Sequence, residues 1–153
     1  MALEIERRFV VSGDAWRGLA PGVQYRQGYL SVEKERTVRV RVVGEQAWLT
    51  LKGNISEISR HEFEYPIPLA DAQTIMANMC PMLVDKLRHR IEYAGFVWEV
   101  DEFFGDNAGL VLAEIELPAE DTPFDKPAWV GEEVTLDGRY TNAYLSKQPY
   151  RSW

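Results

Sequence analysis

The first strand-like stretch of the sequence, LEIERRFVV, carries charged residues at alternate positions: Glu4, Glu6 and Arg8. Successive side chains of a β-strand point to opposite faces, so these three charges share one face while Ile5 and Phe9 share the other. Carboxylates can hold a hard divalent cation through their oxygens, and an arginine can hold phosphate oxygens. One such strand is ordinary at a protein surface, so its meaning depends on what the other strands carry.

Six further stretches repeat this alternation of charged and apolar residues. The cations at these positions are Arg39, Arg41, Lys52, Lys86, Arg88 and Arg90. The carboxylates are Glu62, Glu64, Glu99, Asp101, Glu114 and Glu116. Most of them form Arg-x-Arg or Glu-x-Glu doublets, whereas solvated strand faces usually carry Thr, Ser, Lys and Gln with scattered charges. The doublets therefore favour one shared site over a set of independently solvated faces.

The elements that must position these charges are mainly β-strands with few helices, an α+β fold class. A helix is predicted to begin with Asp71 as its N-cap and to stop at Pro81, and a C-terminal helical segment is predicted near 140–148. No repeat or long linker divides the chain, so residues 1–153 are predicted to form a single domain. About eight strands are predicted, from the stretches 3–11, 24–32, 37–43, 47–52, 60–67, 83–94, 96–104 and 110–117, with a shorter strand-like stretch at 129–134.

Two arrangements can accommodate seven cations and eight carboxylates on strand faces. In the first, every charged face looks at water and the apolar faces form a sandwich core. In the second, an eight-stranded antiparallel sheet closes into a barrel whose charged faces line an aqueous tunnel. Unpaired charges are too costly for a dry interior, but in a wet tunnel they can compensate one another. A polyphosphate–metal complex would need this mixture of carboxylates and cations, which favours the barrel.

Composition narrows the class of protein. The chain of 153 residues is 46% hydrophobic and 27% charged, with a net charge of -7, which is a globular balance without the basic footprint of a nucleic-acid binder. No apolar run approaches the roughly 20 residues needed to span a membrane, and the N-terminal residues do not resemble a signal peptide. Cys80 is the single cysteine and cannot form an internal disulfide. We therefore expect a cytoplasmic protein with no nucleic-acid or membrane partner.

The ordered set of charges resembles the triphosphate tunnel metalloenzymes, also called the CYTH superfamily. EIERRF is similar to the Glu-x-Glu-x-Lys signature of that family, and the later doublets follow in the same order. The stretches RQGYLS, GEEVT and RYTN resemble the short bacterial members in particular. The resemblance covers nearly the whole chain. It implies an eight-stranded barrel that binds triphosphate compounds together with a divalent metal, Mg²⁺ or Mn²⁺. It also implies a possible homodimer.

The resemblance also implies roles for individual residues. Arg8, Lys52 and Lys86 would be the catalytic cations. The substrate would be bound by Arg39, Arg41, Arg88, Arg90 and Tyr29. The metal-ligand candidates are Glu4, Glu6, Glu62, Glu64, Asp101, Glu114 and Glu116. Arg8 departs from the family, which usually has lysine at this position; arginine keeps the charge but has a wider, planar head that does not exchange a proton near neutral pH.

The resemblance favours hydrolysis of inorganic tripolyphosphate to pyrophosphate and phosphate, with a small-molecule triphosphate as the partner. Class IV adenylyl cyclase and thiamine triphosphatase are alternatives on the same fold. A non-catalytic module that binds polyphosphate or nucleotide is an alternative of another class, which the arginine at position 8 keeps open.

Overall fold

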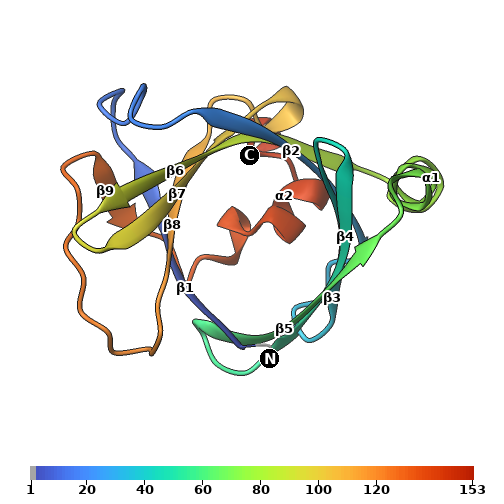
Figure 1. Cartoon of the computed structure of the whole chain (residues 1–153), viewed down its shortest axis with the longest axis horizontal. Coiled ribbons are helices and arrows are strands. Elements are labelled where there is room, and N and C mark those ends of the chain that lie inside the picture. The colour runs from blue at the N-terminus through green and yellow to red at the C-terminus, as the bar shows by residue number, and fades with distance from the viewer. Residues whose placement is uncertain (1–2) are drawn as a thin grey trace.

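Eight antiparallel strands form a closed barrel in the computed structural model, which describes residues 3–153 (Figure 1). Hydrogen-bonded neighbours follow the order β5-β4-β3-β2-β6-β7-β8-β1, and β1 pairs again with β5. The predicted fold class is therefore confirmed. The barrel strands are β1 (Leu3–Val11), β2 (Gly22–Ser31), β3 (Thr37–Val43), β4 (Gln46–Asn54), β5 (Ser59–Ile67), β6 (Leu83–Tyr93), β7 (Phe96–Phe103) and β8 (Val111–Glu116).

The barrel closes along β1, which divides its partners between its two halves. The first half pairs with β5 through three residue pairs, Leu3 with His61, Glu4 with Arg60 and Ile5 with Ser59. Farther along, β1 pairs with β8 on one side and with a short ninth strand, β9 (Val130–Glu133), on the other. Each of the eight strands therefore has a paired neighbour on both sides, although β5 beyond His61 pairs with β4 alone in the described chain.

Most of the hydrophobic core lies outside the barrel wall, because the inward faces carry the charges over most of their length. The outward faces of β1, β6, β7 and β8 are covered by the segment after β1 and by the chain between β8 and β9. Trp98 and Trp16 are almost fully buried there, and Trp98 packs edge-on against Trp129. The sandwich arrangement, with its charged faces toward water, is thus ruled out.

Helix α1 (Leu69–Met79) covers another part of the outer wall. Its buried residues Ala72 and Met76 pack with Val40 and Ala47 of β3 and β4. The prediction that Asp71 is the N-cap is wrong, because Pro68 holds that position, three residues earlier, and Asp71 lies in the first turn. No side chain caps this end; the Pro68 carbonyl accepts the first helical hydrogen bond, from the Ala72 N–H. No helix of residues 3–153 is long and apolar enough to cross a membrane.

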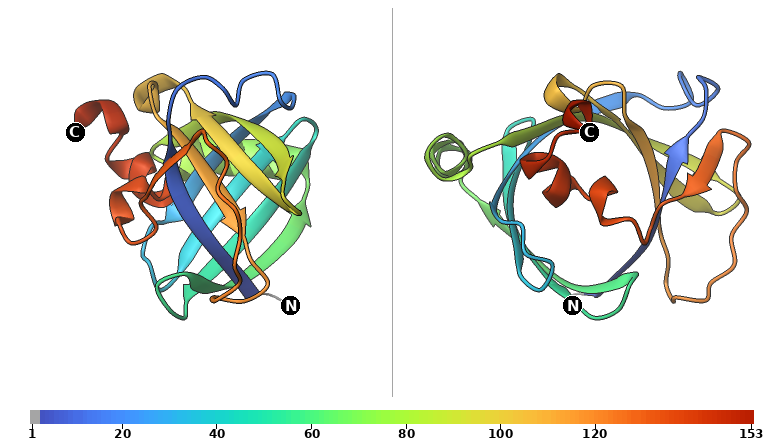
Figure 2. Two further views of the ribbon diagram at one scale, coloured as in Figure 1. Left: turned by 90° about the vertical axis from the view of Figure 1, so that its left-hand side faces the viewer. Right: turned by 180° about the vertical axis from the view of Figure 1, so that it is seen from behind.

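The C-terminal segment crosses one end of the barrel (Figures 1 and 2). It contains α2 (Asn142–Lys147), whose N-cap Thr141 accepts a hydrogen bond from the Tyr144 backbone N–H. Leu145 of α2 is fully buried against Val84 and Leu112, which continue the inward faces of β6 and β8 beyond the charged residues. The inward face thus changes from charged to apolar where α2 packs. Three short 3₁₀ turns, Gly105–Asn107, Gly138–Tyr140 and Tyr150–Ser152, complete the chain.

Candidate active site

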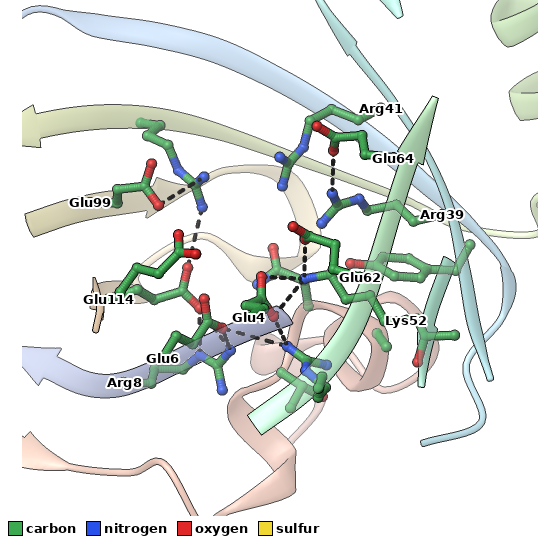
Figure 3. A pocket seen from close by; sticks show the side chains of 18 of the residues that line it. Glu4, Glu6, Arg8, Arg39, Arg41, Lys52, Glu62, Glu64, Glu99 and Glu114 are labelled. Atoms are coloured by element: carbon green, nitrogen blue, oxygen red, sulfur yellow. Dashed lines mark hydrogen bonds and ion pairs between the residues drawn. The ribbon is translucent and has the colours of Figure 1, made fainter. Parts of the chain in front are cut away.

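A polar cavity of about 180 Å³ lies in the barrel lumen (Figure 3). Seven cations and seven carboxylates line it, together with Tyr29, Thr37 and the start of the C-terminal helical segment. We call it the tunnel. Its cations are Arg8, Arg39, Arg41, Lys52, Arg60, Lys86 and Arg88, and its carboxylates are Glu4, Glu6, Glu62, Glu64, Glu99, Glu114 and Glu116.

Strand register explains why so many charges can share one lumen. Antiparallel pairing places Glu4 opposite Arg60, Lys52 opposite Glu62 and Arg8 opposite Glu114. The Lys52 Nζ donates to both oxygens of Glu4, at 3.1 and 3.0 Å. The guanidinium of Arg8 donates through Nε and Nη2 to Glu114 Oε2, at 2.9 and 2.7 Å. Opposite charges on facing residues stabilise a sheet, so these pairs offset part of the cost of burying charge.

Two facing pairs break this rule and bring carboxylates together. Glu6 lies opposite Glu116, and Glu99 lies opposite Glu114. Burial and the charges of Glu114 and Glu4 raise the pKa of Glu6 to about 8. Burial and the charges of Glu4 and Glu62 likewise raise the pKa of Glu116. Like charges on facing residues are destabilising, so this wall is suited to a bound cation.

Carboxylate oxygens are the ligands that Mg²⁺ and Mn²⁺ prefer, so the donor set of this wall fits such an ion. Within residues 3–153, however, no three acidic, histidine or cysteine side chains already converge on one point as a coordination shell. Glu4 and Glu114 instead face lysine and arginine partners. An ion entering here would therefore exchange carboxylate–cation contacts for carboxylate–metal contacts.

The opposite side of the tunnel carries Arg39 and Arg41, whose charges are less fully paired than those of Arg8 and Lys52; Figure 3 shows Arg39 beside Glu64. Arg41 forms no ion pair with a carboxylate of the described chain; its Nε donates to the Gln27 amide oxygen at 3.0 Å. Burial and the neighbouring Arg39 and Arg88 lower the pKa of Arg41 to about 10. Arg39 approaches Glu64 only at 3.5 Å, and its buried Nε has no hydrogen-bond partner. These unsatisfied donors indicate an anion site.

Lys86 and Arg88 are held by a buried carboxylate on the neighbouring strand, where Asp101 faces Arg88. Asp101, nearly fully buried, accepts from the Lys86 Nζ at 2.8 Å and from the Arg88 Nε at 2.8 Å. Burial lowers the pKa of Lys86 to about 7. The charge of Asp101 opposes this shift, but the charges of Arg88 and Arg41 add to it. Lys86 can therefore exchange a proton near neutral pH, while Arg88, whose pKa is raised by its carboxylates, stays charged.

The structure brings most of the predicted site residues to the tunnel and leaves two outside it. Arg90 is exposed and pairs with Glu99 beyond the cavity. Asp101 does not line the cavity, because both its oxygens face Lys86 and Arg88. The alternation indicated Glu99, but no role was assigned to it, and Arg60 was omitted although it has the same parity as Glu62 and Glu64. Gln27, which is buried, and Asn142, which is partly exposed, were also omitted, and no charge pattern marks them.

Three comparisons relate this geometry to known proteins. The family model described as "CYTH domain" matches residues 2–147. A protein from Acetivibrio thermocellus named inorganic triphosphatase is 51% identical over 100% of this chain and 99% of its own. A Nitrosomonas europaea protein of the same name is 35% identical over 94% and 96%.

Solved structures agree with the sequence relatives. A crystal structure described as that of an inorganic triphosphatase superposes with a TM-score of 0.68 and 33% identity, over 93% of this chain and 96% of the other. A conserved hypothetical protein from Pyrococcus furiosus, 17% identical, superposes with a TM-score of 0.61 over 77% and 80% of the two chains. The latter similarity concerns the fold alone.

Proposed function

Because the chain belongs to the CYTH domain family, we propose that it is an inorganic triphosphatase, which hydrolyses tripolyphosphate to pyrophosphate and phosphate. Two relatives of that name align with nearly the whole chain, at 51% and 35% identity. The alignments cover nearly all of both relatives as well, so they include the whole tunnel barrel.

The observation that carries the proposal is the division of the tunnel into two unlike walls. One wall carries Arg41, which has no carboxylate partner within residues 3–153, and Arg39, whose Nε has no hydrogen-bond partner, and the other carries carboxylates on facing residues. A chain of phosphates with a divalent metal satisfies both walls at once, because its oxygens bind guanidinium groups and its metal binds carboxylates. A bare anion would satisfy only the first wall.

In this mechanism the arginines bind and orient the phosphate chain. Arg39, Arg41 and Arg88 would donate to the phosphate oxygens and stabilise the charge that develops on the transferred phosphoryl group and on the departing pyrophosphate. Lys86, held by Asp101, adds a donor that can also supply a proton to the leaving group near neutral pH. We assign Asp101 to the positioning of these two cations.

The carboxylates would hold the metal and the attacking water. Glu4, Glu6, Glu62, Glu114 and Glu116 are the residues that would hold Mg²⁺ or Mn²⁺, with Glu64 at the edge of the set. A divalent ion supplies neutralisation of phosphate charge and lowers the pKa of a bound water. Glu6, whose pKa is raised to about 8 in the metal-free protein, would release its proton on binding the ion.

A substrate panel tests the proposal. Phosphate release would be measured from tripolyphosphate, ATP and thiamine triphosphate, each with Mg²⁺ and with Mn²⁺, and cyclic AMP would be assayed in the ATP arm. We expect the highest kcat/KM for tripolyphosphate and its loss by about 100-fold or more in Arg39→Ala, with wild-type rates in Arg36→Ala, an exposed arginine outside the tunnel. Turnover of ATP or thiamine triphosphate alone, or binding of tripolyphosphate without turnover, would overturn the assignment.

We further propose a cytoplasmic homodimer. The outer faces of β4 and β5 leave Leu51, Phe63 and Tyr65 exposed, next to Leu3 of β1, and neither α1 nor the C-terminal segment packs on them. Apolar side chains gathered on one uncovered face are typical of subunit contacts. Sedimentation equilibrium should give a mass of two chains, and Tyr65→Lys should shift it toward one; a wild-type mass of one chain would contradict the dimer.

A further inference from the structure

Two side-chain amides, the buried Gln27 and the partly exposed Asn142, connect the cations of the tunnel to the C-terminal helix. Gln27 of β2 is fully buried, and its amide oxygen accepts from the Arg41 Nε at 3.0 Å. Its amide nitrogen donates to the Tyr29 hydroxyl at 3.0 Å and to the Asn142 Oδ1 at 3.2 Å. The same Asn142 oxygen accepts from the Lys86 Nζ at 2.8 Å. We call Gln27 and Asn142 the amide pair.

Neither amide is needed to hold its own element in place. β2 is fixed by ladders to β3 and β6 on its two sides, and in the first of these Gln27 faces Arg41. α2 is anchored by the fully buried Leu145 and capped by Thr141. Packing and backbone hydrogen bonds thus account for the fold here, and the amide contacts with Arg41 and Lys86 remain to be explained.

The chemistry of the two acceptors explains them. A carboxylate would orient a cation and cancel its charge, as Glu114 does for Arg8. An amide oxygen orients a cation through a hydrogen bond and leaves its full charge for an anion. Arg41 has no carboxylate partner in the part of the chain that the structure describes, so Gln27 is what fixes the direction of its guanidinium. Asn142 gives the Lys86 ammonium a second, neutral acceptor beside Asp101.

We propose that Gln27 and Asn142 are positioning residues, which orient Arg41 and Lys86 for phosphate binding without neutralising them. This inference rests on the proposed function only in taking a phosphate chain as the ligand of the tunnel. It assigns to the C-terminal helix a part in the site, since Asn142 reaches Lys86 only when α2 is docked.

The test replaces each neutral acceptor by the carboxylate of the same shape. Gln27→Glu and Asn142→Asp keep an acceptor oxygen near each cation but add the charge that the proposal excludes. We expect each to weaken tripolyphosphate binding to the metal-free protein, measured by isothermal titration calorimetry in EDTA, by about tenfold or more. The matched controls Gln73→Glu and Asn78→Asp add the same charge on exposed positions of α1 and should change the affinity less than about twofold.

A second pair of variants tests orientation and covers the case in which a buried carboxylate prevents folding. Gln27→Met and Asn142→Ala remove the acceptors without adding charge, and we expect about three- to tenfold weaker binding with a smaller loss of melting temperature than in Leu145→Ala. With the enzyme turning over, Gln27→Met should raise KM more than it lowers kcat. A merely structural role would instead lower the melting temperature and leave the affinity of the folded protein unchanged, as Leu145→Ala should.

The outcomes separate this inference from the proposed function. If folded Gln27→Glu and Asn142→Asp bind tripolyphosphate as tightly as wild type, or if Gln27→Met and Asn142→Ala do so, the amide pair has no positioning role. The inference is also overturned if the wild-type protein does not bind tripolyphosphate in EDTA. If the wild type binds tripolyphosphate but releases no phosphate with either metal, the triphosphatase assignment fails while the calorimetric comparison still decides the inference.

Discussion

Arg8 occupies the position where a lysine is usual in the family signature, and its contacts use what distinguishes arginine from lysine. Two of its nitrogens donate to Glu114, and one of these also donates to Glu6 at 2.9 Å. A planar fork can serve two carboxylates in this way, whereas a lysine ammonium is a single compact charge on a flexible stem. Arg8 therefore holds two metal-ligand candidates in place and competes with the metal for them.

The substitution Arg8→Lys should loosen this competition. We expect the metal concentration for half-maximal activity to fall about three- to tenfold, and stability without metal to fall by about 1–2 kcal/mol, because two hydrogen bonds to carboxylates are lost. Metal titration of phosphate release and urea unfolding in EDTA measure the two effects. If Arg8→Lys is as inactive as Arg8→Ala, the planar head itself is required for catalysis.

Glu6 gives the stability of the metal-free protein a pH dependence of known sign. Its pKa rises from the ordinary value of 4.5 to about 8 in the folded protein, mainly because the carboxyl group is buried. Between these pH values the unfolded chain releases a proton that the folded chain keeps, so raising the pH favours unfolding.

The variant Glu6→Gln lacks this proton release. We expect it to gain about 1–3 kcal/mol relative to wild type as the pH rises from about 5 to about 8, measured by urea unfolding in EDTA. Mg²⁺ added at pH 8 should stabilise wild type more than the variant. A difference between the two proteins that does not change with pH would show that Glu6 is ionised in the fold.

The alternation of charges predicted most of the tunnel residues, because the period of two fixes which face a side chain occupies. It could not tell that Arg90 extends past the cavity or that Asp101 is used up by Lys86 and Arg88, since both depend on where each strand meets the tunnel. Gln27 and Asn142 are uncharged and far apart in sequence, and only the folded chain brings them together.

At the scale of elements, the same alternation predicted the strands well and the helix boundary less well. β3 has the predicted bounds, 37–43, because its valines and arginines leave no ambiguity. The predicted start of α1 was wrong: Asp71 is a residue type that often caps helices, but the helix begins directly after Pro68. Val84 and Leu112 follow the charged residues on the inward faces of β6 and β8, and α2 packs against them. The sequence pattern did not predict this contact.

Since most of the core lies outside the wall, stability and activity should be separable by element. Met76→Ala removes a buried side chain that joins α1 to β3 and β4. We expect a loss of about 2–3 kcal/mol in the free energy of unfolding and kcat within about twofold of wild type. Denaturation and phosphate release measure the two. A tenfold loss of kcat in folded Met76→Ala would show that α1 packing shapes the tunnel.

At the scale of the whole molecule, charge is divided between inside and outside. The formal charges of the seven cations and seven carboxylates that line the tunnel cancel, so most of the net charge of -7 resides outside it. An anionic substrate therefore approaches a surface of its own sign, and salt should screen this repulsion.

We expect kcat/KM for tripolyphosphate, at saturating metal, to rise about twofold between about 20 and about 150 mM KCl. A site that attracts its substrate by an overall positive field would show the opposite slope. A steep fall in kcat/KM over this range would mean that the tunnel cations, and not the acidic exterior, govern the approach of the substrate.

The closing seam between β1 and β5 has a consequence for how the empty and the occupied protein differ. The shortest ladder of the barrel includes Glu4 paired with Arg60, and both of these side chains line the tunnel. A ligand that binds Glu4 therefore acts directly on the contacts that close the barrel. Backbone amides along this seam should therefore exchange hydrogen more slowly when the tunnel is occupied, while the amides of α1, which packs outside the wall, serve as the reference.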